Sequence, residues 1–153
     1  MKIMIKAILF DWSGVLSDDM KTTYLTAIDV LKIRGINEPM DINRFKDLYE
    51  LPWNRVYEKM GYNVDLSEEN ILWSREMPKH LHHTKLYPFT KKLLQDLKKE
   101  KIKVLIISSR EENSIKQEIE QNKIGHLVDR IYSTPGSIFQ LRKARSNTSI
   151  KNY

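Results

Sequence analysis

Two stretches of the chain are almost continuously apolar, and each has the length of a single strand. They cover residues 3–10, interrupted only by Lys6, and residues 104–107. Apolar runs of this kind are typical of strands that are covered on both faces of a sheet. A third strand is expected over residues 128–132. The pattern therefore predicts three strands, and the segments between them have a different periodicity.

Apolar residues between the strands recur at helical spacing. Tyr24, Ile28 and Leu31 predict a helix over about 18–34, which Gly35 ends. The side chains that could cap the start of this helix are those of Ser17, Asp18 and Asp19.

Residues 36–84 carry short apolar faces separated by prolines, and nothing in them is typical of a strand. Asp41 is expected to cap the first of these helices, and Ser67, followed by Glu68 and Glu69, the third. Residues 17–84 are thus predicted to form a small α-helical cap inserted after the first strand. The insert could simply pack as a helical layer, but a lid over the end of the first strand is the sharper interpretation.

Three of the four histidines fall in this insert, at His80, His82 and His83. Imidazoles at such spacing can bind a transition metal. Because lysines flank them and no carboxylate or cysteine is nearby in the sequence, we expect an ordinary polar connector instead.

The second half of the chain alternates helices and strands. A helix carrying Leu93, Leu94 and Leu97 precedes the strand at 104–107, and Ser109 with Glu112 forms a capping-box pattern that opens the next helix. Strand, helix, strand, helix and strand in this order imply parallel pairing with right-handed crossovers. The predicted fold is α/β, a Rossmann-like parallel sheet, with a core of residues 1–16 and 85–153 and the helical cap at 17–84.

Composition narrows the setting. The chain has 153 residues, of which 41% are hydrophobic, and it has no cysteine. A folded domain is expected, and a disulfide framework or a thiolate metal site is excluded; a reducing cytoplasmic location is the simplest expectation. The apolar N-terminal run is too short to span a membrane, so no membrane association is expected.

Positive charge is concentrated near the C-terminus. The net charge is +6, and residues 139–153 hold four basic residues and no acid. A basic tail of this kind can bind phosphates or nucleic acid. A solvated terminus is its more frequent role, so nucleic-acid binding is not expected.

Polar residues that could do chemistry follow the first two strands. Asp11 is the first polar residue after the first strand, and in an open α/β sheet ligands bind at the carboxyl ends of the strands. Gly14 suits a tight turn there, although Asp11 could also merely cap that turn. Ser108 and Ser109 end the second strand just before a helix, where hydroxyls can hold a phosphate; Ser109 is also expected to cap that helix.

The segment Asp11-Trp12-Ser13-Gly14-Val15-Leu16 resembles the first motif of the haloacid dehalogenase superfamily, mostly phosphatases, whose usual form is Asp-x-Asp-Gly-Thr/Val. Here Ser13 replaces the second Asp. Residues 104–108 resemble the second motif, a hydrophobic strand that ends in Ser or Thr. Residues 86–97, with the cap before them, are similar to the phosphoglycolate-phosphatase-like branch.

The resemblance implies a magnesium-dependent hydrolysis of a small phosphate ester. Asp11 would be the nucleophile that forms an aspartyl-phosphate, and Mg²⁺ would be held by Asp11 and the carbonyl of Ser13. Ser108 would donate to the phosphoryl group, with Gly14 and Ser109 also binding phosphate. Because a serine hydroxyl is not appreciably ionised at neutral pH, Ser13 is a poor substitute for the family's acid, whose help is typically worth ~10²–10⁴-fold.

The third and fourth motifs of the family lie toward the C-terminus. Lys143 is at a plausible distance for the lysine of the third motif, with Arg142 and Arg145 beside it; the acidic fourth motif has no counterpart, since no Asp or Glu follows Asp129. We therefore expect either a truncated or frame-disrupted member with an incomplete core or a sheet that a partner chain completes. Its first strand would be a sheet edge prone to self-association. A non-catalytic module that binds a phosphorylated ligand or a protein partner is the alternative function.

Overall fold

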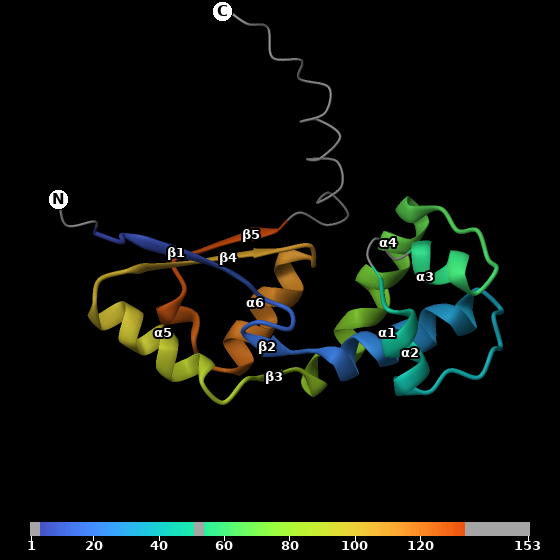
Figure 1. The fold of residues 1–153 in the computed structure, drawn as a ribbon, viewed down its shortest axis with the longest axis horizontal. Helices are drawn as coiled ribbons and strands as arrows, with labels where there is room; N and C mark the ends of the chain where they lie inside the picture. Colours follow the sequence, from blue (N-terminus) through green and yellow to red (C-terminus); the bar gives the residue numbers. More distant parts are fainter. Residues whose placement is uncertain (1–3, 51–53, 134–153) are drawn as a thin grey trace, which may run out of the picture.

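The computed structural model describes residues 4–50 and 54–133. Its helices and strands form two units that lie side by side (Figure 1). In chain order the elements are β1 (Ala7–Asp11), β2 (Ser17–Asp18), α1 (Met20–Ile33), α2 (Ile42–Leu48), α3 (Asn54–Lys59), α4 (Leu66–Glu76), the 3-10 helix η1 (Met77–His83), β3 (Lys85–Leu86), α5 (Thr90–Lys99), β4 (Lys103–Ser108), α6 (Glu112–Gln121), the 3-10 helix η2 (Gly125–Leu127) and β5 (Arg130–Ser133).

The three predicted strands form one parallel sheet in the order β1-β4-β5. Asp11 lies opposite Ile107 in this register, and Ser108 lies opposite Ser133. The α/β fold and the parallel pairing are confirmed. Among the described strands, β1 is at one edge of the sheet, as the sequence led us to expect.

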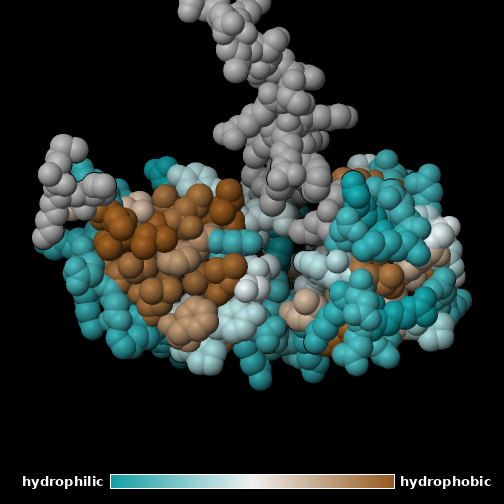
Figure 2. All heavy atoms as spheres, viewed as in Figure 1, coloured by the Kyte–Doolittle hydropathy of each residue, from teal (hydrophilic) through white to brown (hydrophobic). Residues whose placement is uncertain are grey.

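The two faces of this sheet differ. Phe10, Val104 and Ile106 belong to a core cluster that includes residues of α5 and α6. Leu9 is 53% exposed and Tyr132 44% exposed, and Figure 2 shows apolar side chains gathered on the surface of this unit. Coverage on both faces is therefore a wrong prediction for the part of the chain that the structure describes, because its helices pack against one face.

The other unit, which we call the helical unit, consists of α1–α4 and η1. It has a hydrophobic cluster of its own, made by Ala27, Val30, Leu31, Ile36, Met40, Phe45, Tyr57, Trp73, Met77 and Leu81. The described part of residues 36–84 contains no strand, as predicted. His80, His82 and His83 lie in η1, and no group of three metal-binding side chains occurs there or elsewhere in the described residues.

Asp41 caps α2 as predicted, by accepting the N–H groups of Asn43 and Arg44 at 2.8 Å. The cap predicted for α4 is wrong. Asp65, not Ser67, is its N-cap residue and accepts the N–H of Ser67 at 2.8 Å. An aspartate two residues upstream supplies the acceptor, so Ser67 is already inside the helix.

The residues expected to cap α1 form a short strand and an ion pair instead. Ser17 and Asp18 form β2, which pairs antiparallel with β3, and Asp18 accepts the N–H of Met20 only at 3.4 Å. Asp19 occupies the N-cap position without a side-chain capping bond, because its carboxylate pairs with Arg110 instead. The chain thus crosses between the two units twice, at residues 17–19 and 84–86, and β2 and β3 hold the two crossings together (Figure 1).

Candidate active site

Asp11 is the last residue of β1 and lies beside the end of β4, because its register partner Ile107 immediately precedes Ser108. Its carboxylate accepts the N–H of Trp12 at 2.7 Å, so it also fixes the turn that follows it. Burial raises the pKa of Asp11; the bond from Trp12 opposes this, and the nearby charge of Asp19 adds to it. A carboxylate held in this way would be better stabilised by a neighbouring cation.

The turn after Asp11 is organised by the buried Trp12. Its carbonyl accepts the N–H groups of Leu16 and Ser17 at 3.0 Å. Within the turn that these bonds close, Gly14 has φ +74°, a conformation that favours glycine. The N–H of Gly14 donates to the carbonyl of Ser17 at 2.8 Å. Gly14 therefore shapes this loop through its backbone conformation, and its N–H is already used.

Ser13 follows Trp12 in this loop and forms an isolated β-bridge with Ser17. Its hydroxyl oxygen is buried and has no hydrogen-bond partner among the described residues. The Nε of Arg110 is in the same situation. Buried polar groups are normally paired, so these two atoms are unused hydrogen-bonding capacity on the two loops that follow β1 and β4.

Ser108 is buried at the end of β4, and its hydroxyl oxygen accepts the N–H of Arg110 at 3.2 Å. With that acceptor role filled by the backbone, the hydroxyl proton is available to a ligand. Ser109 does not cap the following helix: α6 begins at Glu112, its N-cap residue is Glu111, and no side chain caps it. The helix begins two residues later than the capping-box pattern implied, and the side chain of Arg110 in the longer loop reaches Asp19 and Glu118.

Glu118 of α6 is fully buried beneath the site. It accepts the indole N–H of Trp12 at 2.6 Å, the hydroxyl of Thr84 at 2.8 Å and the guanidinium of Arg110 at 2.7 and 3.1 Å. Arg110 also donates to Asp19 at 3.0 Å. The sequence analysis identified none of these roles. The only available signal was the position of Glu118, one residue before the core residue Ile119 on an amphipathic helix.

Tyr49 is the C-cap residue of α2, and the charges of this site act on its phenol. Burial raises the pKa of its phenol, the charges of Asp19 and Asp11 raise it further, and Arg110 opposes them. Its ring packs edge-on against Phe45, with the centroids 5.9 Å apart. In the sequence this residue falls among the apolar positions of residues 36–84, and no local pattern connects it with Asp11.

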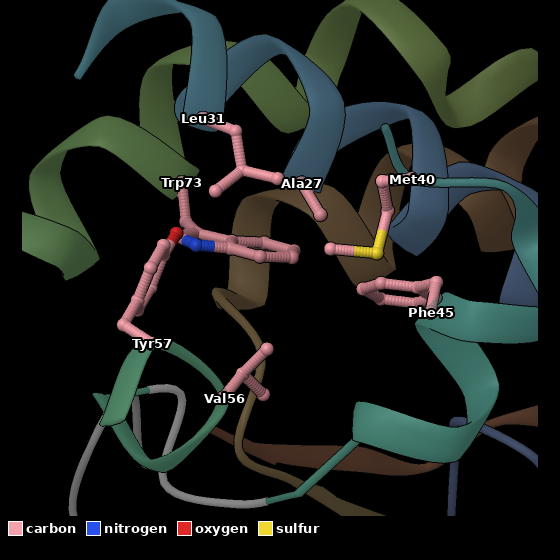
Figure 3. Close-up of a pocket in the computed structure, with 7 residues that line it drawn as sticks. All are labelled: Ala27, Leu31, Met40, Phe45, Val56, Tyr57 and Trp73. Carbon is pink, nitrogen blue, oxygen red and sulfur yellow. The ribbon is translucent and has the colours of Figure 1, made fainter. Parts of the chain in front are cut away.

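The cavity shown in Figure 3 is not part of this site. It lies within the hydrophobic cluster of the helical unit, between residues such as Leu31, Phe45 and Trp73. Its volume is about 10 Å³, roughly the minimum for a single water. The candidate site is thus defined by the strand ends and not by this void.

Hard oxygen ligands are present at the end of β1. Mg²⁺ is usually held by one or two carboxylates, with water and substrate oxygens completing its shell. Asp11 and the carbonyl of Ser13 fit that pattern, whereas Asp19 is already paired with Arg110. Lys143, predicted for the third motif, lies outside the described residues.

Comparison with known proteins decides the family. The sequence profile of the haloacid dehalogenase-like hydrolases matches residues 8–136. The chain belongs to this family. The matched segment includes the strand ends that carry Asp11 and Ser108, and no curated protein matches the chain.

Solved structures of haloacid dehalogenase-like hydrolases share the fold. One from Bacteroides fragilis is 19% identical with a TM-score of 0.74, covering 95% of this chain and 75% of its own. A protein from Lactobacillus plantarum described as a phosphoglycolate phosphatase is 15% identical with a TM-score of 0.73, covering 94% and 72%. CbbY from Rhodobacter sphaeroides, solved in complex with phosphate, is 14% identical with a TM-score of 0.69, covering 85% and 64%.

The described helices include none that is long and apolar enough to cross a membrane.

Proposed function

We propose that this haloacid dehalogenase-like hydrolase is a phosphatase that acts on a small phosphate ester through Asp11. The observation that carries the proposal is the position of Asp11 and Ser108 at the carboxyl ends of two adjacent parallel strands. The family supports it, as does the structural likeness to a protein that was solved with phosphate.

In the proposed reaction a carboxylate oxygen of Asp11 attacks phosphorus, the bond from phosphorus to the ester oxygen breaks, and the alcohol leaves with that electron pair and a proton from solvent. Water then attacks the aspartyl-phosphate, which frees the carboxylate and inorganic phosphate and returns a proton to solvent. The sum is ester plus water giving alcohol plus phosphate. Asp11 suits this role because an aspartate carboxyl is ionised at neutral pH without a helper base.

Three hydroxyls would hold the phosphoryl oxygens. Ser108 has a free proton to donate, Ser13 has an unpartnered buried hydroxyl, and Ser109 follows Ser108 on the same loop. Asp11 and the Ser13 carbonyl would hold Mg²⁺, which when bound offsets the repulsion between the carboxylate and the phosphate.

The serine at position 13 determines the expected rate of turnover. Because the two proton transfers fall to solvent, turnover should be ~10²–10⁴-fold slower than with a positioned carboxylic acid. The chain thus has the nucleophilic carboxylate of Asp11 but, with Ser13, lacks the acid that would donate a proton to the leaving group. This combination favours a slow enzyme. The second candidate function is a module that binds a phosphorylated ligand without turnover.

We further propose that residues 17–84 act as a cap that selects the substrate, over a core formed by residues 1–16 and 85–153. The electrostatic coupling of Tyr49 to Asp11 supports this assignment. We propose Tyr49 as one cap side chain that meets the part of the substrate beyond the phosphate.

The test is phosphate release from an aryl phosphate by the full chain, with and without Mg²⁺. Asp11→Asn should abolish magnesium-dependent release, because an amide is not a nucleophile here, while Asp47→Asn, which changes an exposed aspartate on α2, should not. Release that persists in folded Asp11→Asn would exclude the mechanism. Binding of inorganic phosphate without any release would identify the binding module instead.

A further inference from the structure

The guanidinium of Arg110 joins the first crossing to the core. It donates to Asp19 at 3.0 Å and to Glu118 at 2.7 Å, and Asp19 stands at the start of α1. The side chains of Arg110, Asp19 and Glu118 are only 9%, 10% and 0% exposed. Charge-assisted bonds in such a buried setting impose a defined geometry.

The second crossing is held by the same glutamate. Thr84, the residue before β3, donates its hydroxyl to Glu118 at 2.8 Å and lies 2.8 Å from the hydroxyl of Thr22 on α1. Both connections between the helical unit and the sheet therefore end on one buried cluster, formed by Arg110, Glu118 and Asp19.

The backbone of Arg110 belongs to the phosphate side of the site. Its N–H donates to the hydroxyl oxygen of Ser108 at 3.2 Å, and its carbonyl accepts the hydroxyl of Ser133. Trp12, which shapes the loop after Asp11, donates to the same Glu118. The two loops that carry the reacting groups are thus fastened to the cluster that holds the crossings.

The next residue of the same loop makes a direct contact with the helical unit. Glu111 accepts the hydroxyl of Ser74 on α4 at 2.7 Å. A displacement of the helical unit would therefore pull on residues 110 and 111, and through them on Ser108.

We propose that Arg110 is a positioning residue that fixes the helical unit against the sheet and, through its own backbone, aligns the Ser108 hydroxyl with Asp11. The inference rests on the proposed function for the meaning of that alignment. The position of the helical unit can be measured without any turnover.

The experiment measures the distance between the two units by pulsed electron paramagnetic resonance. Because the chain has no cysteine, spin labels can be placed through Lys32→Cys on α1 and Lys91→Cys on α5, both exposed positions. Asp19→Asn and Thr84→Val each loosen one crossing and should broaden the distance distribution. Tyr57→Phe removes the hydroxyl that donates to the buried Glu69 inside the helical unit. This control variant should leave the distance distribution unchanged.

A second readout connects the cluster to the chemistry. Asp19→Asn should lower kcat for an aryl phosphate, by as much as ~10²-fold if the reacting groups move by about 1 Å, and should leave KM close to its original value. Arg110→Lys should retain more activity than Arg110→Met. If Arg110→Met does not fold, the two crossing variants decide the matter.

The inference is overturned if Asp19→Asn and Thr84→Val give the same distance distribution as Tyr57→Phe. If the unmodified chain releases no phosphate, the proposed function is wrong. The distances between the two spin labels would still show whether Arg110 and Glu118 hold the two units together.

Discussion

Two buried glutamates in this protein, Glu69 and Glu118, accept hydrogen bonds from the same kinds of side chain. They lie in different parts of the molecule. Glu69, within the helical unit, accepts the indole N–H of Trp73 at 2.7 Å, the Nε–H of Arg34 at 2.9 Å and the hydroxyl of Tyr57, and it forms an ion pair with Nη2 of Arg34 at 2.8 Å. Glu118 likewise accepts from a tryptophan, an arginine and a hydroxyl.

The difference is where the donors come from. Among the described residues, the donors to Glu69 all belong to the helical unit, and two of them, Tyr57 and Trp73, are members of its hydrophobic cluster. The partners of Glu118 come from the loop after β1, the loop after β4 and the second crossing. The same chemistry stabilises one unit in the first case and joins two units at the site in the second.

The largest expected effect on the free energy of unfolding comes from replacing the arginine of each cluster, Arg34 or Arg110. Removing one partner of a buried ion pair typically costs about 3–5 kcal/mol. Arg34→Met should fall at the lower end, since Glu69 is the single buried carboxylate that it leaves without a cation. Arg110→Met should cost more, because it leaves the carboxylates of both Glu118 and Asp19 without their cation.

Urea unfolding of both arginine variants measures these costs. A loss of stability in Arg34→Met equal to or above that in Arg110→Met would contradict the assigned roles of the two clusters.

A smaller effect is expected from the indoles. Trp12→Phe and Trp73→Phe each leave a buried carboxylate one donor short, at a cost of about 1–3 kcal/mol. Trp12→Phe should in addition reduce phosphate release, since Trp12 carries the loop after Asp11. Trp73→Phe serves as the matched control, and the comparison fails if both variants slow release equally.

The smallest effect is a dependence on alkaline pH. Burial, and then the hydrogen bond to Glu69, raises the pKa of Tyr57. The stabilisation from the protonated phenol is therefore complete below about pH 10, the ordinary value, and is lost as the pH rises above it.

Thermal unfolding between pH 9 and 11 checks this sign. The stability difference between the unmodified chain and Tyr57→Phe should shrink above about pH 10. The corresponding difference for Thr84→Val should stay flat, because a threonine hydroxyl does not titrate in this range. A constant difference for Tyr57→Phe would show that its phenol does not keep its proton as the structure implies.

The sequence was sufficient for the three strands of the parallel sheet, for most of the helices and for the polar residues that lie at the strand ends. Apolar runs and helical spacing depend on near neighbours in the chain, so the strands around Ile8 and Ile106 and the helix around Leu94 could be predicted. Asp11, Gly14 and Ser108 were recognisable because the position of a polar residue after a strand is itself a local pattern.

The tertiary structure alone decided which charges are buried and which sheet face is covered. Glu69 read as an acid in the first turn of a surface helix, and Glu118 as an ordinary polar position, because their partners are remote in sequence: Trp12 is 106 residues from Glu118. A charged side chain is buried only where donors converge on it in space. The spacing of residues along one helix carries no record of that convergence.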